Sequence, residues 1–204
     1  MGLKTNFQLL AGVTVVALSA ITSAIAADSV RVRGTIVGLE GSTLTVKARE
    51  GTTEAIALKP DWKVSGVAKA SLDDIKVGDF VGIASLPKAD GGDGALEVLV
   101  FPAAMKGTGE GSYGWDLKPN STMTNATVAD AVKSVDGRTV TVSYHGQTKK
   151  ISIGANTPIV TFAPATPADL VAGATVFIPA EKGDGGKLAA GRVIVATNGV
   201  VPPM

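Results

Sequence analysis

Hydrophobic and polar residues alternate along several short segments of the chain. Residues 43–47 read Thr-Leu-Thr-Val-Lys, so that apolar side chains fall on one face of an extended strand and polar ones on the other. The same alternation returns at 53–58, after a Glu50–Gly51 pair that is typical of a hairpin turn. Pro60 is expected to end that strand, because proline cannot donate a hydrogen bond within a sheet.

The segments around this hairpin complete a small β-domain. Further strands are predicted at 30–37, 80–84 and 96–101. Between the third and fourth strands, Ser71 can cap the backbone N–H of Asp74 and so begin a short helical turn. The order is therefore strand, strand, strand, helical turn, strand, strand.

This pattern occurs twice in the chain. Gly41–Val46 (GSTLTV) matches Gly137–Val142 (GRTVTV), and Ser71–Ile75 (SLDDI) matches Thr166–Leu170 (TPADL). Matching glycines and apolar positions at a nearly constant offset indicate an internal repeat. In the second copy Thr166 replaces Ser71 as the predicted cap, so the turn chemistry is repeated as well.

The repeat predicts the domain organisation. We expect an all-β protein with two tandem domains, 28–101 and 128–200, joined by an inter-repeat segment at 102–127. Five strands and one short helical turn in about 70 residues are typical of the OB-fold, a small Greek-key barrel. The predicted fold is thus two tandem OB-like barrels. An SH3-like barrel or an open meander would give nearly the same pattern.

The N-terminus predicts export. Lys4 precedes an apolar run at 9–25, and Ala24-Ile25-Ala26 resembles a cleavage site for a signal peptidase. Residues 1–26 are therefore expected to be a signal peptide, and the mature protein to be periplasmic or secreted without a membrane span. Removing them takes away one lysine, which leaves equal numbers of basic and acidic side chains.

Composition excludes several functions. A neutral mature chain has no long-range attraction for nucleic acid. The absence of cysteine excludes disulfides, thiol nucleophiles and thiolate metal sites. Lys47, Arg49, Lys149 and Lys150 fall on the predicted second and third strands, but without aromatic residues beside them they are interpreted as solvated strand charges. No serine lies in a nucleophile-elbow motif, so no catalytic residue and no cofactor are predicted.

The inter-repeat segment is the part of the mature chain that the duplication does not explain. It is too rich in specific side chains for a spacer, which is usually polar and featureless. Its candidate ligand or junction residues are Glu110, Tyr113, Trp115, Asp116, Lys118 and Asn125. Two hypotheses stay open. Trp115 and Leu117 pack across the junction of the barrels, or the segment contacts a ligand, with Glu110 and Asp116 as acceptors and Trp115 as a stacking wall.

A metal site is the alternative. His145 is the single histidine, at a predicted hairpin tip. Together with Met105 or Met123 it could form a soft copper site if the segment folded over the second barrel.

Three stretches carry a resemblance to a known family. Gly34–Val46 (GTIVGLEGSTLTV) and Leu72–Val81 (LDDIKVGDFV) resemble bacterial secreted β-barrel repeats catalogued as a domain of unknown function. Relatives with a segment like Gly107–Asn125 (GTGEGSYGWDLKPNSTMTN) are often labelled "metal ABC transporter permease". A permease needs several apolar spans of about 20 residues, and only the signal segment is that apolar. The resemblance implies tandem OB-like barrels behind a signal peptide and no catalytic residues.

Together these patterns predict a periplasmic or secreted, non-enzymatic binding or structural protein. Its specific site is expected at the barrel–barrel junction, and its partner is an unknown envelope protein or small ligand. The alternative is a periplasmic metal-handling accessory protein associated with metal transport or resistance.

Overall fold

A computed structural model describes residues 28–134 and 137–203 of the chain. The predicted signal peptide at 1–26 lies outside the described residues. The described chain is all-β, as expected, and contains a closed five-stranded barrel. None of its helices is long and apolar enough to cross a membrane.

Twelve strands and four short 3₁₀ helices make up the described chain. The strands are β1 (Asp28–Glu40), β2 (Thr43–Ala48), β3 (Thr53–Lys69), β4 (Phe80–Pro87), β5 (Asp93–Val100), β6 (Gly111–Gly114), β7 (Thr122–Ser134), β8 (Gly137–Tyr144), β9 (Gln147–Gly154), β10 (Ile159–Ala163), β11 (Thr175–Lys182) and β12 (Leu188–Ala196). The 3₁₀ helices are η1 (Leu72–Asp74), η2 (Ala103–Met105), η3 (Pro167–Asp169) and η4 (Asp184–Gly186).

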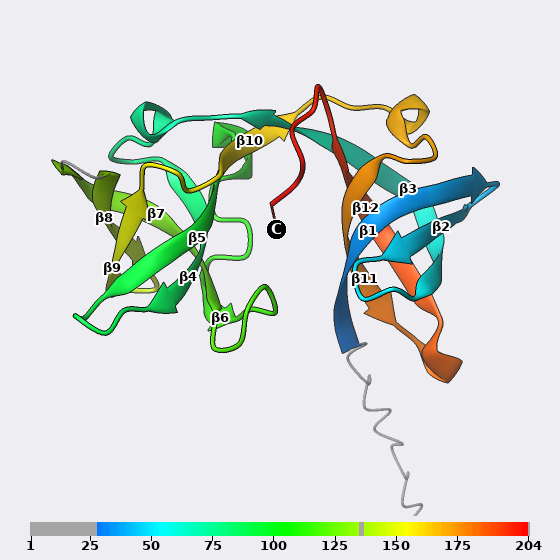
Figure 1. Cartoon of the computed structure of the whole chain (residues 1–204), viewed down its shortest axis with the longest axis horizontal. Coiled ribbons are helices and arrows are strands. Elements are labelled where there is room, and N and C mark those ends of the chain that lie inside the picture. The colour runs from blue at the N-terminus through cyan, green and yellow to red at the C-terminus, as the bar shows by residue number, and fades with distance from the viewer. Residues whose placement is uncertain (1–27, 135–136, 204) are drawn as a thin grey trace, which may run out of the picture.

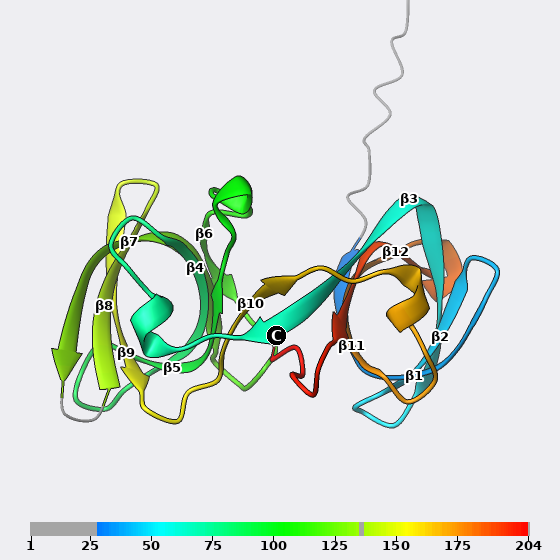
Figure 2. The same cartoon turned by 90° about the horizontal axis from the view of Figure 1, so that it is seen from above.

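The strands pair in two closed rings (Figures 1 and 2). In the first ring, β1, β2, β3, β12 and β11 follow one another, and β11 pairs back to β1. In the second ring, the order is β7, β8, β9, β5 and β4, and β4 pairs back to β7. Strand β10 pairs with β3 and with β5, so it connects the rings.

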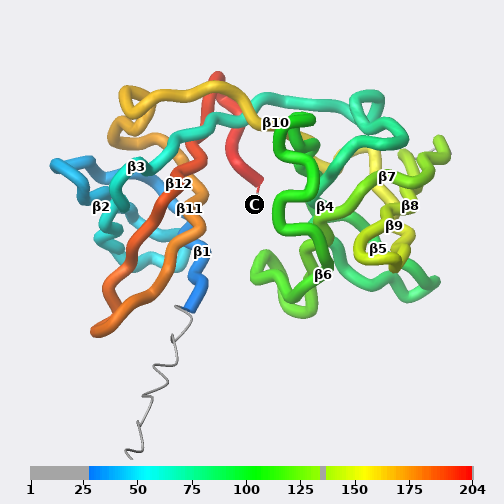
Figure 3. Tube along the Cα trace, turned by 180° about the vertical axis from the view of Figure 1, so that it is seen from behind, coloured from blue at the N-terminus to red at the C-terminus, as the bar shows by residue number. Residues whose placement is uncertain are grey.

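The pairings contradict one expectation, because neither repeat closes on itself. Strands β4 and β5 belong to the predicted domain 28–101 but complete the second ring. Strands β11 and β12 belong to the predicted domain 128–200 but complete the first. The chain crosses between the rings along β3 and returns through β10, as can be followed in Figure 3. The two repeats have thus exchanged their last two strands.

The length of β3 explains the exchange. The strand has 17 residues, and at about 3.3 Å per residue it spans roughly 55 Å. The prediction that Pro60 ends it is wrong. The pairing of β3 with β12 shifts register between Leu58 and Lys63, so Pro60 and Asp61 lie in a bulge where proline needs no ladder hydrogen bond. Because β3 continues past the bulge, it carries the chain away from the first ring.

The hydrophobic residues form three clusters. One fills the first ring, with Leu44, Val46 and Ile56 at its centre, and one fills the second, with Val140 and Ile151. A third lies between the rings and contains Val67, Leu99, Val160, Phe177 and Ile194. We call this third group the junction cluster. Its members alternate along their strands with ring-core residues, so strands such as β5 and β11 are apolar on both faces.

The two predicted caps are confirmed. The hydroxyl and backbone N–H of Ser71 both hydrogen-bond the carboxylate of Asp74, at 2.8 Å each. Thr166 and Asp169 repeat the arrangement, with distances of 3.0 and 2.7 Å. These capping boxes begin η1 and η3, which stand at corresponding places in the two repeats.

Candidate functional site

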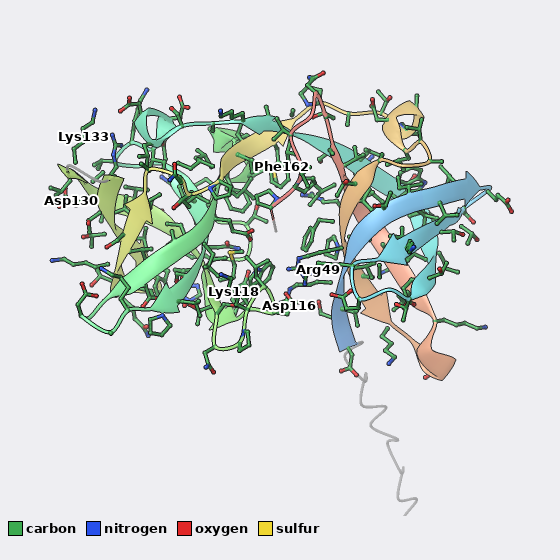
Figure 4. The ribbon with its side chains drawn as sticks, viewed as in Figure 1. Arg49, Asp116, Lys118, Asp130, Lys133 and Phe162 are labelled. Atoms are coloured by element: carbon green, nitrogen blue, oxygen red, sulfur yellow. The ribbon has the colours of Figure 1, made fainter. Side chains whose placement is uncertain are left out.

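The inter-repeat segment reaches from the second ring towards the first. Strand β6 pairs with the beginning of β7, and the turn between them is closed by the Ser121 hydroxyl, which lies 2.9 Å from the carbonyl oxygen of Trp115. This turn carries Trp115, Asp116 and Lys118. Figure 4 shows Asp116, Lys118 and the Arg49 side chain in the region between the two rings.

Trp115 packs against side chains of the first ring. Its ring centroid lies 6.3 Å from that of Phe177, a member of the junction cluster, and 6.2 Å from that of Tyr113. The guanidinium carbon of Arg31 lies 4.0 Å from the Trp115 centroid, which is close enough for a cation–π interaction. The indole is therefore held between an aromatic ring and a cation.

Asp116 forms the polar half of the same contact. Its carboxylate accepts two hydrogen bonds from the Arg33 guanidinium, at 2.8 and 3.1 Å. Burial disfavours the charged carboxylate, but the hydrogen bonds and positive charge of Arg33 outweigh it and hold the pKa of Asp116 below its usual value. A bidentate pair of this kind fixes the orientation of both side chains.

Glu97 lies beside this contact and was missed by sequence reasoning. It belongs to β5 and is only 3% exposed. Neither its Oε1 atom nor the Nε1 atom of Trp115 has a hydrogen-bond partner among the described residues. Burial raises the pKa of Glu97 to about 8, although the charge of Arg33 lowers it. Its sequence signal is a single acid in the otherwise apolar run Leu96–Val100.

Three other predicted residues hold the segment onto the second ring. The Asn125 side-chain amide donates to the Tyr113 hydroxyl at 3.0 Å and to the Gly109 carbonyl at 3.2 Å. The Glu110 carboxylate accepts the backbone N–H of His145 at 3.0 Å. The structure thus divides the predicted group. Trp115 and Asp116 contact the first ring, Glu110 and Asn125 contact the second, and the Lys118 side chain is exposed.

The residues of the metal alternative come from three places: Met105 from η2, Met123 from β7 and His145 from the turn after β8. Met123 is buried in β7, where it pairs with Ala84 and Tyr113. Within 28–134 and 137–203, no three acidic or histidine side chains gather in a group that could hold a metal ion. The site of Met105, Met123 and His145 stays a prediction of the sequence.

A basic pocket opens on the first ring next to the junction. Its volume is about 550 Å³. It is lined by Arg33, Gly34, Thr35, Lys47, Ala48, Arg49, Thr175, Val176, Val201, Pro202 and Pro203. Three of these side chains are cationic and none is acidic. The sequence interpretation of Lys47 and Arg49 as solvated strand charges missed the pocket, because the C-terminal residues that form its wall are distant in the chain.

Comparisons with known proteins found no relative of this chain. No protein-family model matches it, and neither the curated proteins nor the solved structures contain a match.

Proposed function

We propose that this chain is an exported, non-catalytic binding protein of two OB-like barrels, and that its ligand is an anion bound in the basic pocket of the first ring. The observation that carries the proposal is the pocket of about 550 Å³ lined by Arg33, Lys47 and Arg49. Its size lies within the range of small-ligand sites. The five-stranded order of each ring supports the OB-like assignment.

The charge of the pocket selects the ligand. Basic and acidic side chains nearly balance in the chain as a whole, whereas this lining holds three cations and no acid. Arg33 is paired with Asp116 and Arg49 with Glu50, so Lys47 supplies the net positive charge of the concave surface. Guanidinium and ammonium groups donate hydrogen bonds and accept none. Such a lining can hold a carboxylate or phosphate, but it supplies no general base at neutral pH, which favours binding over catalysis.

A larger pocket makes a weaker candidate. It measures about 710 Å³ and lies between Lys69–Asp73 and Ala155–Val160. Lys69 and Asp73 are its charged lining residues, so their opposite charges select neither an anion nor a cation.

The junction supports the pocket in this proposal. Asp116 holds the Arg33 guanidinium through two hydrogen bonds, and Trp115 packs on Phe177 of β11. These contacts would fix the position of one pocket wall, since β1 and β11 both contribute to the lining. The inter-repeat segment then acts as the structural partner of the site.

Calorimetric titration with pyrophosphate and with citrate at low salt tests the proposal. We expect at least one of these anions to bind with a dissociation constant below about 1 mM, and the binding to weaken as salt is added. Lys47→Glu should weaken it at least tenfold. Lys63→Glu is the matched control, because Lys63 is an exposed lysine on β3 of the same ring and does not line the pocket. Equal losses in both variants, or no binding of either anion, would contradict the proposal.

A further inference from the structure

The two rings can be compared residue by residue. In the first ring, Thr35 of β1 pairs with Lys47 of β2 and with Thr175 of β11. In the second ring, Thr127 of β7 pairs with Ser143 of β8 and with Phe80 of β4. The register therefore equates β1 with β7 and β2 with β8. By this correspondence Arg33, Lys47 and Arg49 of the basic pocket match Asn125, Ser143 and His145.

In the second ring, this place is occupied by the chain itself. The Asn125 amide donates to the carbonyl oxygens of Thr108 and Gly109, at 3.4 and 3.2 Å. The carboxylate of Glu110 accepts the N–H of His145. A glycine–glutamate–glycine stretch thus lies over the positions that correspond to the basic pocket.

The same segment also adds a strand to the second ring. Residues 111–114 of β6 pair antiparallel with residues 122–125 of β7. Strand β8 pairs with β7 only from Thr127 onwards. Strand β6 therefore takes the edge of β7 that β8 leaves uncovered.

In the first ring, the corresponding edge is open. Strand β2 pairs with β1 from Gly34 onwards, and one more hydrogen bond runs from the Arg49 N–H to the Arg33 carbonyl oxygen, at 2.7 Å. On that side of β1, no strand of the described chain pairs with residues 28–33. The first ring thus has both an open pocket and an open strand edge where the second ring has a bound segment.

We propose that the first ring binds an extended acidic segment of another protein, in the way that the second ring binds residues 107–114 of its own chain. This inference rests on the proposed function, since the pocket must accept an anion. The segment adds as a strand beside residues 28–33 of β1 and places a carboxylate near Lys47 and Arg49. Strand addition provides main-chain hydrogen bonds, and the pocket provides specificity.

The residues at matching positions of the two rings indicate the chemistry of the bound segment. The second ring presents neutral Asn125 and Ser143 and accepts a segment with one glutamate. The first ring has Arg33, Lys47 and Arg49 at the matching positions. The Arg33 guanidinium is bound by Asp116, so the carboxylate of an acidic segment gains from Lys47 and Arg49. Because the backbone N–H of Arg49 already bonds Arg33, the carboxylate meets the Arg49 guanidinium instead.

We expect glycine residues next to the acidic residue of the segment that binds the first ring. A side chain at Gly109 would come within 3.2 Å of the Asn125 amide nitrogen, and Gly107, Gly109 and Gly111 all have positive φ angles. The backbone at Gly109 therefore passes close to the Asn125 side chain, and all three residues have conformations that favour glycine.

A titration of the mature chain with a synthetic peptide tests the inference. The probe is the blocked octapeptide Gly-Thr-Gly-Glu-Gly-Ser-Tyr-Gly, which has the sequence of residues 107–114. We expect it to shift the backbone amide NMR signals of residues 28–33 and 47–49. Replacing its glutamate by glutamine should weaken binding at least fivefold. Replacing its tyrosine by proline should also weaken binding. The Trp115 N–H bonds the Ser121 carbonyl oxygen, so Tyr113 and Met123 form the next hydrogen-bonded pair in that register, and proline cannot donate this bond.

Protein variants show which of the two rings binds the peptide. Lys47→Glu should weaken peptide binding at least fivefold, whereas the control Lys63→Glu should leave it unchanged. Shifts confined to residues 122–127 and 143–145 would show exchange with the segment in the second ring and would overturn the inference. Peptide binding that appears only after removal of residues 201–204 would identify the C-terminal tail as the occupant and would also overturn it.

Titration with small anions distinguishes a failure of the peptide inference from a failure of the proposed function. If pyrophosphate or citrate binds and the peptide does not, the peptide inference fails while the anion site stands. If neither the anions nor the peptide bind, both fail. Equal affinity for the glutamate and glutamine peptides excludes the acidic ligand.

Discussion

The residue with the most unusual surroundings is Glu97. Its carboxyl group is buried at the junction of the rings, where the charges of Arg33, Arg49 and Asp116 and the indole N–H of Trp115 act on it. Burial of a carboxylate without a full set of hydrogen bonds is costly. The stability of the junction is therefore expected to depend on the protonation of Glu97 at neutral to alkaline pH, whereas the Asp116 contact depends on protonation only at acidic pH.

Glu97 should make the protein less stable as pH rises. Its pKa is about 8 in the folded protein, against 4.5 for the ordinary group, so the folded state holds the proton more tightly than the unfolded chain. The free energy of unfolding should therefore fall from pH 5 to pH 9, by a few kcal/mol if this group dominates. Glu97→Gln should remove most of that fall and should be more stable than the wild type at pH 9.

Urea denaturation at pH 5 and pH 9 measures this effect. The carboxylates of Asp93 and Asp116 have lowered pKa values, so their contribution is lost only at more acidic pH and does not overlap with this window. Glu40→Gln, at an exposed position of β1, controls for the removal of one negative charge. Parallel pH curves for the wild type and Glu97→Gln would show that the carboxyl group is not held neutral.

Sequence reasoning identified the junction residues only in part. Trp115 and Asp116 stood out because a spacer has no use for them, and the structure brings both against the first ring. Glu97, Lys47 and Arg49 were not recognised, since an acid in an apolar run and bases on a strand are common in exposed sheets. Their significance depends on which surface lies opposite. Trp115 and Asp116 of the inter-repeat segment lie near Glu97, and the second repeat with the C-terminal residues completes the pocket at Lys47 and Arg49.

At the scale of elements, local patterns were sufficient for most strands and turns. The alternation at 43–47 produces a strand with Leu44 and Val46 fully buried. The repeated capping boxes produce η1 and η3. The prediction failed at Pro60, because a bulge lets a strand pass through proline without losing a ladder hydrogen bond.

The bulge of β3 should be sensitive to the residue after Pro60. Asp61 has a φ of 58°, a conformation that β-branched residues strongly disfavour. Asp61→Val should lower the free energy of unfolding by about 1–2 kcal/mol, whereas Asp61→Gly should be close to neutral or slightly stabilising. Chemical denaturation of the two variants measures the difference. Equal stabilities would mean that the backbone at this position is not held at positive φ.

At the scale of the whole molecule, the exchange of strands ties the halves together. Each ring takes three strands from one repeat and two from the other. Separating the repeats would therefore open both rings and expose both cores, in addition to breaking the junction cluster.

A single cut between the repeats should leave the molecule intact. A protease site inserted between Pro119 and Asn120, which are exposed at the turn before β7, would divide the chain into two fragments after cleavage. We expect the fragments to elute together in gel filtration and to separate only in denaturant. Self-contained repeats would be joined by the junction alone, so fragments that separate on dilution in native buffer would contradict the exchange.

The sequence by itself predicted most of the strands, the turns and the caps, because these depend on residues that are neighbours in the chain, and the repeat could be recognised from the sequence directly. It did not predict β6 and β10. The tertiary structure alone decided which strands complete which ring. Since the repeats are similar, strands β4 and β5 fit either half, and the sequence pattern is the same for both arrangements. The 17-residue β3 leads the chain to the second ring, so β4 and β5 complete that ring and not the first. The same crossing brings Glu97 to the junction and leaves one ring with an open basic pocket, which no local pattern could have shown.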